Sequence, residues 1–267
     1  MNFAMLVFRA TLRGQRTSIA LMSVGLLAFA FLMSATFDAF GEATLELMES
    51  MPQGFQSLLK AATGAGSASM NYMAIGYRHP VPLIITAGFV VAASSGAMAR
   101  EIERGSIFLL LSRPVPRPHF MVAKLGSMVV GLVVFQAFIL LGTWIGATTY
   151  DLVGMDYGVV ALIMVNGLFL TLALAGLAFP ISAVSSDGGR AITLSSGLLV
   201  ALFFVDFLAG TWSAVEAIGP ISPFHYYDPV GVVSAGSVPA LHLGVLAAFA
   251  VGGLTLAALA FGRRDIP

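Results

Sequence analysis

The densest group of ionisable side chains in the sequence lies between Arg100 and Lys124, where it separates two long apolar runs. This charged segment holds two acids and five cations: Glu101, Glu103, Arg100, Arg104, Arg113, Arg117 and Lys124. A charged side chain at the centre of a bilayer costs at least ~2.5 kcal/mol on the insertion scale. The charged segment is therefore expected to lie in water, outside the hydrocarbon of any membrane that the chain crosses.

The remaining ionisable residues do not form a recognisable catalytic or metal-binding motif. The sequence has no HExxH, no GxSxG and no GxxxxGK[ST] motif, and its four histidines are scattered. We therefore expect this chain to be no enzyme and to bind no cofactor and no metal. In particular, it cannot hold ATP through a phosphate-binding loop.

The composition indicates the class of protein. The 267 residues are 58% hydrophobic and only 10% charged, whereas roughly 25% of residues are charged in a soluble domain. Several apolar runs reach the ~20 residues that cross a bilayer as a helix. We predict an all-α integral membrane protein with a single transmembrane domain, residues 1–267, and no general attraction to nucleic acid, because the formal net charge is zero. The predicted spans are residues 18–37, 81–98, 125–148, 159–184, 191–212 and 239–261.

Two segments outside these spans have distinctive patterns. Residues 1–17 place Arg9, Arg13 and Arg16 among apolar side chains, which fits an amphipathic helix at the membrane interface. A short solvated leader that only fixes the orientation is the alternative. The first apolar run is long enough to be a retained helix and not a signal peptide. Residues 38–79 are predicted to form a long polar loop on the outer side.

Residues 100–121 are predicted to form a short helix beneath the bilayer followed by a rigid elbow. A helix can run from Met98 to Leu111 with apolar residues on one side. Three prolines from Pro114 to Pro118 then end it, because proline cannot continue a helix. This shape suits the docking of a partner whose movement is passed to the second and third spans. A basic loop that only sets the topology is the alternative interpretation.

The basic residues predict the orientation in the membrane. With six spans, both termini lie on one side, and that side receives all but two of the 13 Lys and Arg residues, the exceptions being Lys60 and Arg78. Cytoplasmic loops carry an excess of Lys and Arg. We therefore expect a multi-pass protein of the plasma membrane with both termini and the charged segment in the cytoplasm.

The order of residues in the charged segment resembles the ABC-2 family of ATP-binding-cassette permease subunits. The matching positions are Glu101, Glu103, Gly105, the string from Leu109 to Arg117, Phe120 and Lys124. Two further stretches are similar to the family's segment before its last span and to its usual C-terminal ending: Ile221–Pro229 and Phe261–Asp265.

This resemblance implies a six-helix exporter subunit that pairs with a second permease copy, as a homodimer, and binds two copies of a separate ATPase. The ATPase would hold the ATP and Mg²⁺, and membrane lipid would surround the permease. The charged segment would be the coupling helix, seated on the ATPase through Glu101, Glu103, Arg104, Gly105, Arg113, Pro114 and Arg117. The two acids would bond to neighbouring helix ends or to the ATPase, and the last two arginines would contact the ATPase or lipid phosphates.

The resemblance also implies roles for two other regions. Residues 1–17 match the family's interfacial connecting helix. The outer connection between spans five and six would contain re-entrant helices that gate the exit, formed around Pro220, Pro223, Phe224, Tyr226 and Tyr227.

Asp206 leaves a second function open, because it falls within the predicted fifth span. An ionisable residue inside a span is by default a functional candidate, and this aspartate could bind a substrate cation or a proton on a transport path. It could equally sit near the outer end of the span and reach interfacial water or a helix partner. The first interpretation would give a proton-coupled secondary transporter that needs no partner. A scaffold or sensor subunit that couples to an ATPase without transporting is a third possibility.

Overall fold

The structure is a computed structural model that describes residues 3–49, 66–105 and 117–264. Within these residues the chain is helical, and six helices are long and apolar enough to cross a membrane. The predicted all-α architecture with six spans is therefore confirmed. The six apolar stretches are Ala4–Ala39, Ala68–Ala97, His119–Thr149, Tyr157–Val184, Gly188–Thr211 and Ala240–Arg263.

The described part of the chain contains both long and short helices. In order, the described helices are α1 (Phe3–Glu49), α3 (Ala68–Tyr77), α4 (Pro80–Ala97), α5 (Ala99–Glu103), α7 (Arg117–Thr149), α8 (Tyr157–Val184), α9 (Gly188–Thr211), the 3-10 helices η1 (Ser213–Ile221) and η2 (Pro223–Tyr226), α10 (Pro229–Ala235) and α11 (Ala240–Arg263).

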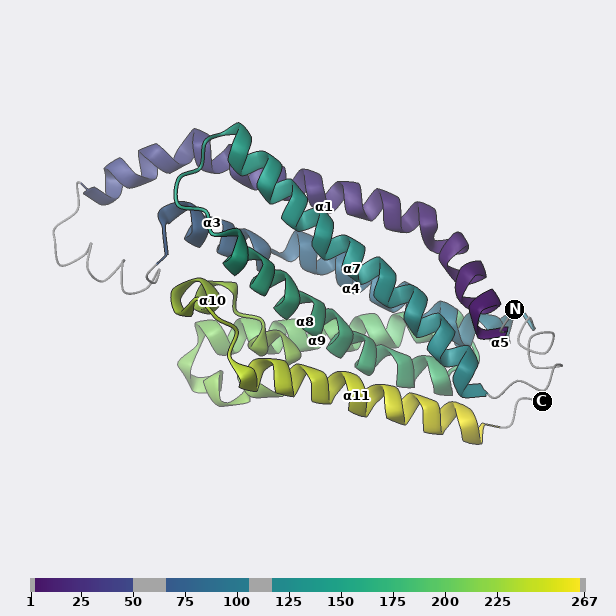
Figure 1. Cartoon of the computed structure of the whole chain (residues 1–267). Coiled ribbons are helices and arrows are strands. Elements are labelled where there is room, and N and C mark those ends of the chain that lie inside the picture. Colours follow the sequence, from purple (N-terminus) through teal and green to yellow (C-terminus); the bar gives the residue numbers. More distant parts are fainter. Residues whose placement is uncertain (1–2, 50–65, 106–116, 265–267) are drawn as a thin grey trace.

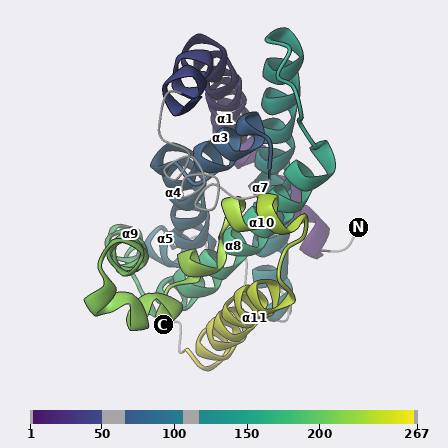
Figure 2. The same cartoon turned by 90° about the vertical axis from the view of Figure 1, so that its left-hand side faces the viewer.

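The long helices form an elongated bundle with two different ends (Figure 1). The first turns of α1, the short helix α5, the start of α7 and the last turn of α11 lie together at one end, which we call the α5 end (Figure 1). Helices α3, η1, η2 and α10 lie at the opposite end, which we call the α10 end (Figures 1 and 2). Because the number of spans is even, the start of α1 and the end of α11 lie at the same end of the bundle.

The N-terminal helix differs from the sequence prediction. We expected an interfacial helix over residues 1–17 and a span that begins after it, whereas α1 continues without a break to Glu49. The arginines between Arg9 and Arg16 lie exposed on this same helix. The residues around the expected boundary include no proline, and a single glycine such as Gly14 costs a helix only about 1 kcal/mol. Charge alone therefore did not interrupt the helix.

The predicted outer loop, residues 38–79, is largely helical where the structure describes it. Helix α1 extends into it, and α3 occupies its last third. The Ser67 hydroxyl caps α3 by accepting a hydrogen bond from a backbone N–H of its first turn at 3.2 Å. The chain then bends at Arg78 and restarts as α4, with Pro80 in the first turn, where a missing N–H is tolerated. Residues 50–65 of the predicted loop lie outside the described residues.

The bundle is held by close backbone contacts at glycines. Helix α1 packs along α7, where a Cβ on Gly142 would lie 2.4 Å from the carbonyl oxygen of Leu27. Helix α8 packs along α11, where a Cβ on Gly253 would lie 1.9 Å from the carbonyl oxygen of Gly176. Small residues let membrane helices approach in this way, since lipid provides no hydrophobic force between them.

Helix α8 is the centre of the bundle, and α9 and α11 are peripheral. The most apolar window of α8 is 56% buried, compared with 22% for α9 and 17% for α11. The outer faces of α9 and α11 are apolar, so lipid or another chain must cover them.

The helix that begins the charged segment is shorter than its sequence suggested. The predicted helix from Met98 to Leu111 is wrong as a continuous element, because α5 ends at Glu103. Gly105 has φ of 70°, in the left-handed region. This conformation is natural for glycine and cannot continue a right-handed helix.

Candidate functional site

Helix α5 is joined to the start of α9 by a carboxylate. Oε2 of Glu103 accepts a hydrogen bond from the backbone N–H of Gly188 at 2.9 Å. Oδ1 of Asp187 accepts another from the backbone N–H of Arg190 in the same first turn. Both carboxylates therefore satisfy N–H groups that the helix itself leaves unpaired, and their charge complements the positive end of the helix dipole.

The close approach of α5 to α9 requires a glycine. A Cβ on Gly188 would lie 2.3 Å from Cγ of Arg100 and 2.9 Å from Oε2 of Glu103. Any larger residue would therefore displace the side chains of Arg100 and Glu103 and disturb the hydrogen bond to the start of α9. On the other side of the same glycine, the Ser95 hydroxyl of α4 donates to its carbonyl oxygen at 2.9 Å.

Helix α8 and helix α7 also hold α5. The backbone N–H of Ala99, the first residue of α5, donates to the hydroxyl of Ser182 in α8 at 3.2 Å. Nζ of Lys124 in α7 lies 2.6 Å from Oε1 of Glu101, and its side chain is only 10% exposed. The same ammonium lies 5.4 Å from the ring centroid of Phe120. A buried ammonium needs such a partner, because an uncompensated buried charge costs several kcal/mol.

The α5 end is completed by a C-terminal arginine. The Arg264 guanidinium donates to the carbonyl oxygens of Ala183 and Ser185, each at 2.8 Å, and to the hydroxyl of Ser186. It thus satisfies the last carbonyls of α8 and places a cation at the negative end of that helix. Five residues join α5 to the neighbouring helices, and we call them the α5 cluster: Glu101, Glu103, Lys124, Ser182 and Gly188.

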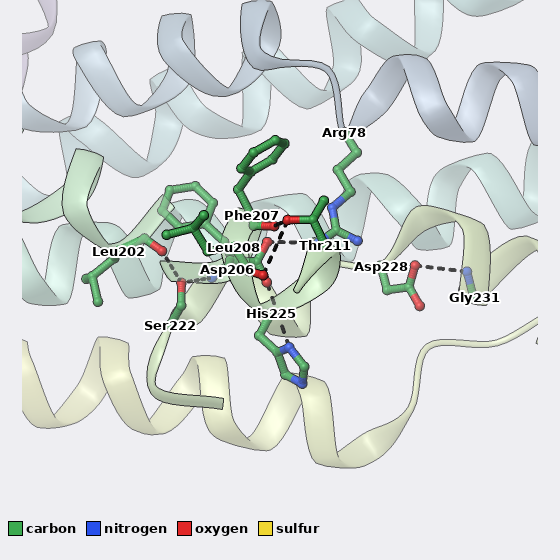
Figure 3. A network of polar contacts seen from close by, with 11 residues as sticks. Arg78, Leu202, Asp206, Phe207, Leu208, Thr211, Ser222, His225, Asp228 and Gly231 are labelled. Atoms are coloured by element: carbon green, nitrogen blue, oxygen red, sulfur yellow. Dashed lines mark hydrogen bonds and ion pairs between the residues drawn. The ribbon is translucent and has the colours of Figure 1, made fainter. Parts of the chain in front are cut away.

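A second polar group, the outer cluster, lies at the α10 end. Oδ2 of Asp206 lies 2.8 Å from the guanidinium of Arg78, and Oδ1 lies 3.7 Å from Nδ1 of His225. Figure 3 shows Asp206 between these two side chains, which come from the bend before α4 and from η2. The aspartate side chain is 7% exposed, whereas Arg78 and His225 are 42% and 44% exposed. The carboxylate is therefore buried beneath partners that reach the surface of the chain.

The connection between α9 and α11 folds back over α9 and α8. The Ser222 hydroxyl donates to the carbonyl oxygen of Leu202 at 2.9 Å (Figure 3), and the rings of Phe203 and Phe224 lie 5.6 Å apart, edge to face. The amide of Asn166 in α8 donates to the carbonyl oxygen of Tyr226 at 3.1 Å. These contacts attach η2 to two spans.

Tyr227 anchors the same connection from inside. Its side chain is buried, and its hydroxyl donates to the carbonyl oxygen of Tyr77 at 3.4 Å. Burial raises the pKa of the Tyr227 phenol, since the phenolate would have to leave water. The phenol therefore remains a neutral hydrogen-bond donor at physiological pH.

Comparison with known proteins decides the family. The model of the ABC-2 family transporter protein matches residues 5–266. The chain belongs to the ABC-2 family. No curated protein matches the sequence. Family membership makes this ABC-2 chain a membrane component of a transporter and implies, in general, an ABC ATPase as its partner.

The α5 cluster contains some of the ABC-2 residues that the sequence predicted for coupling. Glu101 and Glu103 contact neighbouring helices, the first of the two roles that the sequence left open for them. Arg104 follows α5 with an exposed side chain, and Gly105 adopts the left-handed conformation. Arg117 begins α7 and its side chain is outside the described residues, as are Arg113 and Pro114 altogether.

The predicted gate residues of this ABC-2 chain lie together at the α10 end. Pro223, Phe224 and Tyr227 are buried, whereas Pro220 is exposed and its carbonyl oxygen accepts a hydrogen bond from the Tyr226 hydroxyl at 3.0 Å. They belong to two short 3-10 helices and the turn that follows them.

Asp206 lies near the C-terminal end of α9, whose last residue is Thr211. Its partner Arg78 was recognised in the sequence only as one of two basic residues on the outer side. The two residues are 128 positions apart, so no local pattern could have paired them.

Three residues at the α5 end were not predicted as site residues: Ser182, Gly188 and Arg264. Ser182 and Arg264 bond to backbone groups of α5 and α8, and Gly188 binds Glu103 through its own backbone N–H. The Asp187–Gly188 pair before an apolar run is a helix N-terminus signal. That signal could have located the start of α9, but not the glutamate that caps it.

Proposed function

We propose that this ABC-2 chain is the permease subunit of an ATP-driven exporter, and that α5 receives the movement of a separate ATPase. Two permease copies would pair, each with one ATPase subunit, and substrate would pass between the copies. The observation that carries this proposal is the attachment of α5 to three long helices, α7, α8 and α9, through hydrogen bonds and a buried ion pair. A helix attached in this way suits force transmission better than a loop that only fixes topology.

The transmission follows from the individual contacts. If an ATPase displaces α5, Glu103 moves the start of α9 and the Glu101–Lys124 pair moves α7. Ala99 acts at the same time on α8 through Ser182. Since α9 ends beside the outer cluster, displacement of its first turn tends to shift Asp206 relative to Arg78 at the opposite end. Movement at the ATPase would thereby open the exit.

The orientation of the permease follows from charge. The α5 end includes Arg100, Arg104, Lys124 and Arg264, and an excess of Lys and Arg marks the cytoplasmic side. The α5 end would therefore face the cytoplasm at the plasma membrane, where an ATPase has access to ATP. The sparsely buried α9 is the natural face for the second copy, with large apolar side chains such as Phe204 and Phe207 exposed on it.

A proton-coupled mechanism through Asp206 is less well supported. The carboxylate is already paired within the chain, with the Arg78 guanidinium at 2.8 Å and the His225 ring at 3.7 Å. We therefore assign Asp206 to the closure of the α10 end.

Reversal of charge in the coupling region tests the proposal. The permease is purified with its ATPase, reconstituted in vesicles, and compared with the variants Glu103→Lys and Glu103→Lys with Arg117→Glu. We expect ATP hydrolysis by the complex to fall to the rate of the ATPase alone, because α5 loses its attachment to α9. Glu216→Lys, an exposed acid at the α10 end, is the matched control and should leave hydrolysis unchanged. Normal permease-dependent hydrolysis in the charge-reversed complexes would refute the coupling role.

A further inference from the structure

A cavity of about 510 Å³ lies at the α5 end between α1, α4, α5 and α7. We propose that it binds an anionic phospholipid, with the phosphate held by arginines and one acyl chain lying along the apolar wall. The proposal rests on the membrane-spanning fold and requires no ATPase. The lipid belongs to the leaflet that borders the α5 end.

Small side chains leave this space open. Ala10, Gly14 and Ser18 recur at every fourth position of α1, so they lie on one face of that helix. Ala92 and Gly96 do the same on α4. Ala10, Gly14, Ser18 and Ala92 are exposed, so the cavity opens to the surface of the chain, where a lipid can enter.

The charge of the lining suits an anion. Its ionisable members are Arg100, Arg104, Lys124 and Glu101, which is three cations against one acid. Lys124 is already paired with Glu101 at 2.6 Å. Among the described residues, no acid lies within ion-pair distance of Arg100 or Arg104. Two guanidinium groups are therefore available, and guanidinium donors match the geometry of phosphate oxygens.

Gln15 adds a polar side chain to the same lining. A phosphatidylglycerol head group supplies a phosphate for the arginines and hydroxyls for the polar members of the lining.

The apolar part of the lining distinguishes a lipid from a free phosphate ion. Val7, Met22 and Phe89 are among the apolar residues of the lining. An acyl chain gains apolar contacts with such side chains, whereas an inorganic ion does not. Basic pockets between membrane helices are known sites for anionic head groups.

The test measures lipid binding to the purified full-length chain by native mass spectrometry. Phosphatidylglycerol is titrated against phosphatidylcholine, and inorganic phosphate is added as a competitor. We expect phosphatidylglycerol to bind at least about tenfold more tightly than phosphatidylcholine. Millimolar inorganic phosphate should not displace it, because the acyl chain contributes to binding.

Two variants with matched controls locate the site. Arg104→Gln removes one guanidinium, and Gly96→Leu fills the cavity, since a Cβ at this glycine meets no described atom within 4 Å. Each should weaken phosphatidylglycerol binding about tenfold. Arg190→Gln and Gly88→Leu alter an exposed arginine and an equally open glycine outside the cavity, and should have no effect.

Three results would overturn the proposal. They are equal affinity for the two lipids, displacement by inorganic phosphate alone, and unchanged binding in both cavity variants. Should Gly96→Leu fail to fold, Gly14→Leu obstructs the cavity from α1, and a Cβ there also meets no described atom within 4 Å.

Discussion

The two ends of the bundle have cavities of the same size and opposite charge. The cavity at the α5 end and the one beside the outer cluster each measure about 510 Å³. The first is lined by three cations and one acid. The second contains Arg78 and His225 against the carboxylates of Asp206, Glu216 and Asp228. The chain is neutral overall, so this polarity arises from the distribution of charge along the bundle.

The charges are also fixed differently at the two ends. At the α5 end, Glu103 bonds to a backbone N–H and Lys124 is buried against Glu101. At the α10 end, the partners of Asp206 are more than 40% exposed, so water can replace them. Exposed ion pairs contribute little to stability, whereas disruption of a buried pair is costly. The comparison suggests a rigid α5 end that transmits movement and an α10 end that yields to it.

The largest effect should follow disruption of the buried pair. Glu101→Leu leaves the Lys124 ammonium buried without its carboxylate, and we expect the free energy of unfolding to fall by about 3 kcal/mol. Thermal unfolding of the purified chain measures this loss. The double variant Glu101→Leu with Lys124→Met should recover most of it, because no buried charge remains. Equal instability of the single and double variants would contradict a paired, rigid α5 end.

An intermediate effect is expected where α5 meets α9. Gly188→Ala places a Cβ 2.3 Å from Cγ of Arg100 and should destabilise the chain by about 1–2 kcal/mol. Gly197→Ala on the same helix meets no described atom within 4 Å, so it should stabilise the chain by up to about 1 kcal/mol. Changes of opposite sign in the free energy of unfolding, measured by chemical or thermal unfolding, would support the close contact. The same sign for both would argue against it.

The smallest effect should follow disruption of the outer pair. Asp206→Asn removes the carboxylate but leaves Arg78 in contact with water, so the free energy of unfolding should change by about 1 kcal/mol or less. Comparison with Glu101→Leu under identical conditions measures the difference between the two ends. A loss at Asp206 as large as the loss at Glu101 would remove the contrast.

The sequence predicted the spans well and the connections between them poorly. Hydropathy over ~20 residues identifies a membrane helix without any knowledge of its neighbours. Helix α3 was missed because its 10 residues are too few for that signal. The continuity of α1 was missed because arginines were taken to mark a boundary, although they are compatible with a helix.

The candidate sites were only partly predictable, for a related reason. The motif from Glu101 to Gly105 indicated the α5 region, and the left-handed Gly105 explains why glycine stands there. The partners of Glu103 and Asp206 lie 85 and 128 residues away. One of them is a backbone N–H, which every residue except proline possesses, so no residue type could reveal it.

The most direct test of the coupling role uses the absence of cysteine from the sequence. A single cysteine is introduced at the exposed Arg104 beside α5 or, as a control, at the exposed Ser234 of α10. Each permease is then treated with a short bifunctional crosslinker in native membranes. We predict that Arg104→Cys crosslinks to an ATPase subunit, with a yield that changes when ATP is added, and that Ser234→Cys does not. A crosslink to the ATPase from Ser234→Cys, and none from Arg104→Cys, would contradict the account.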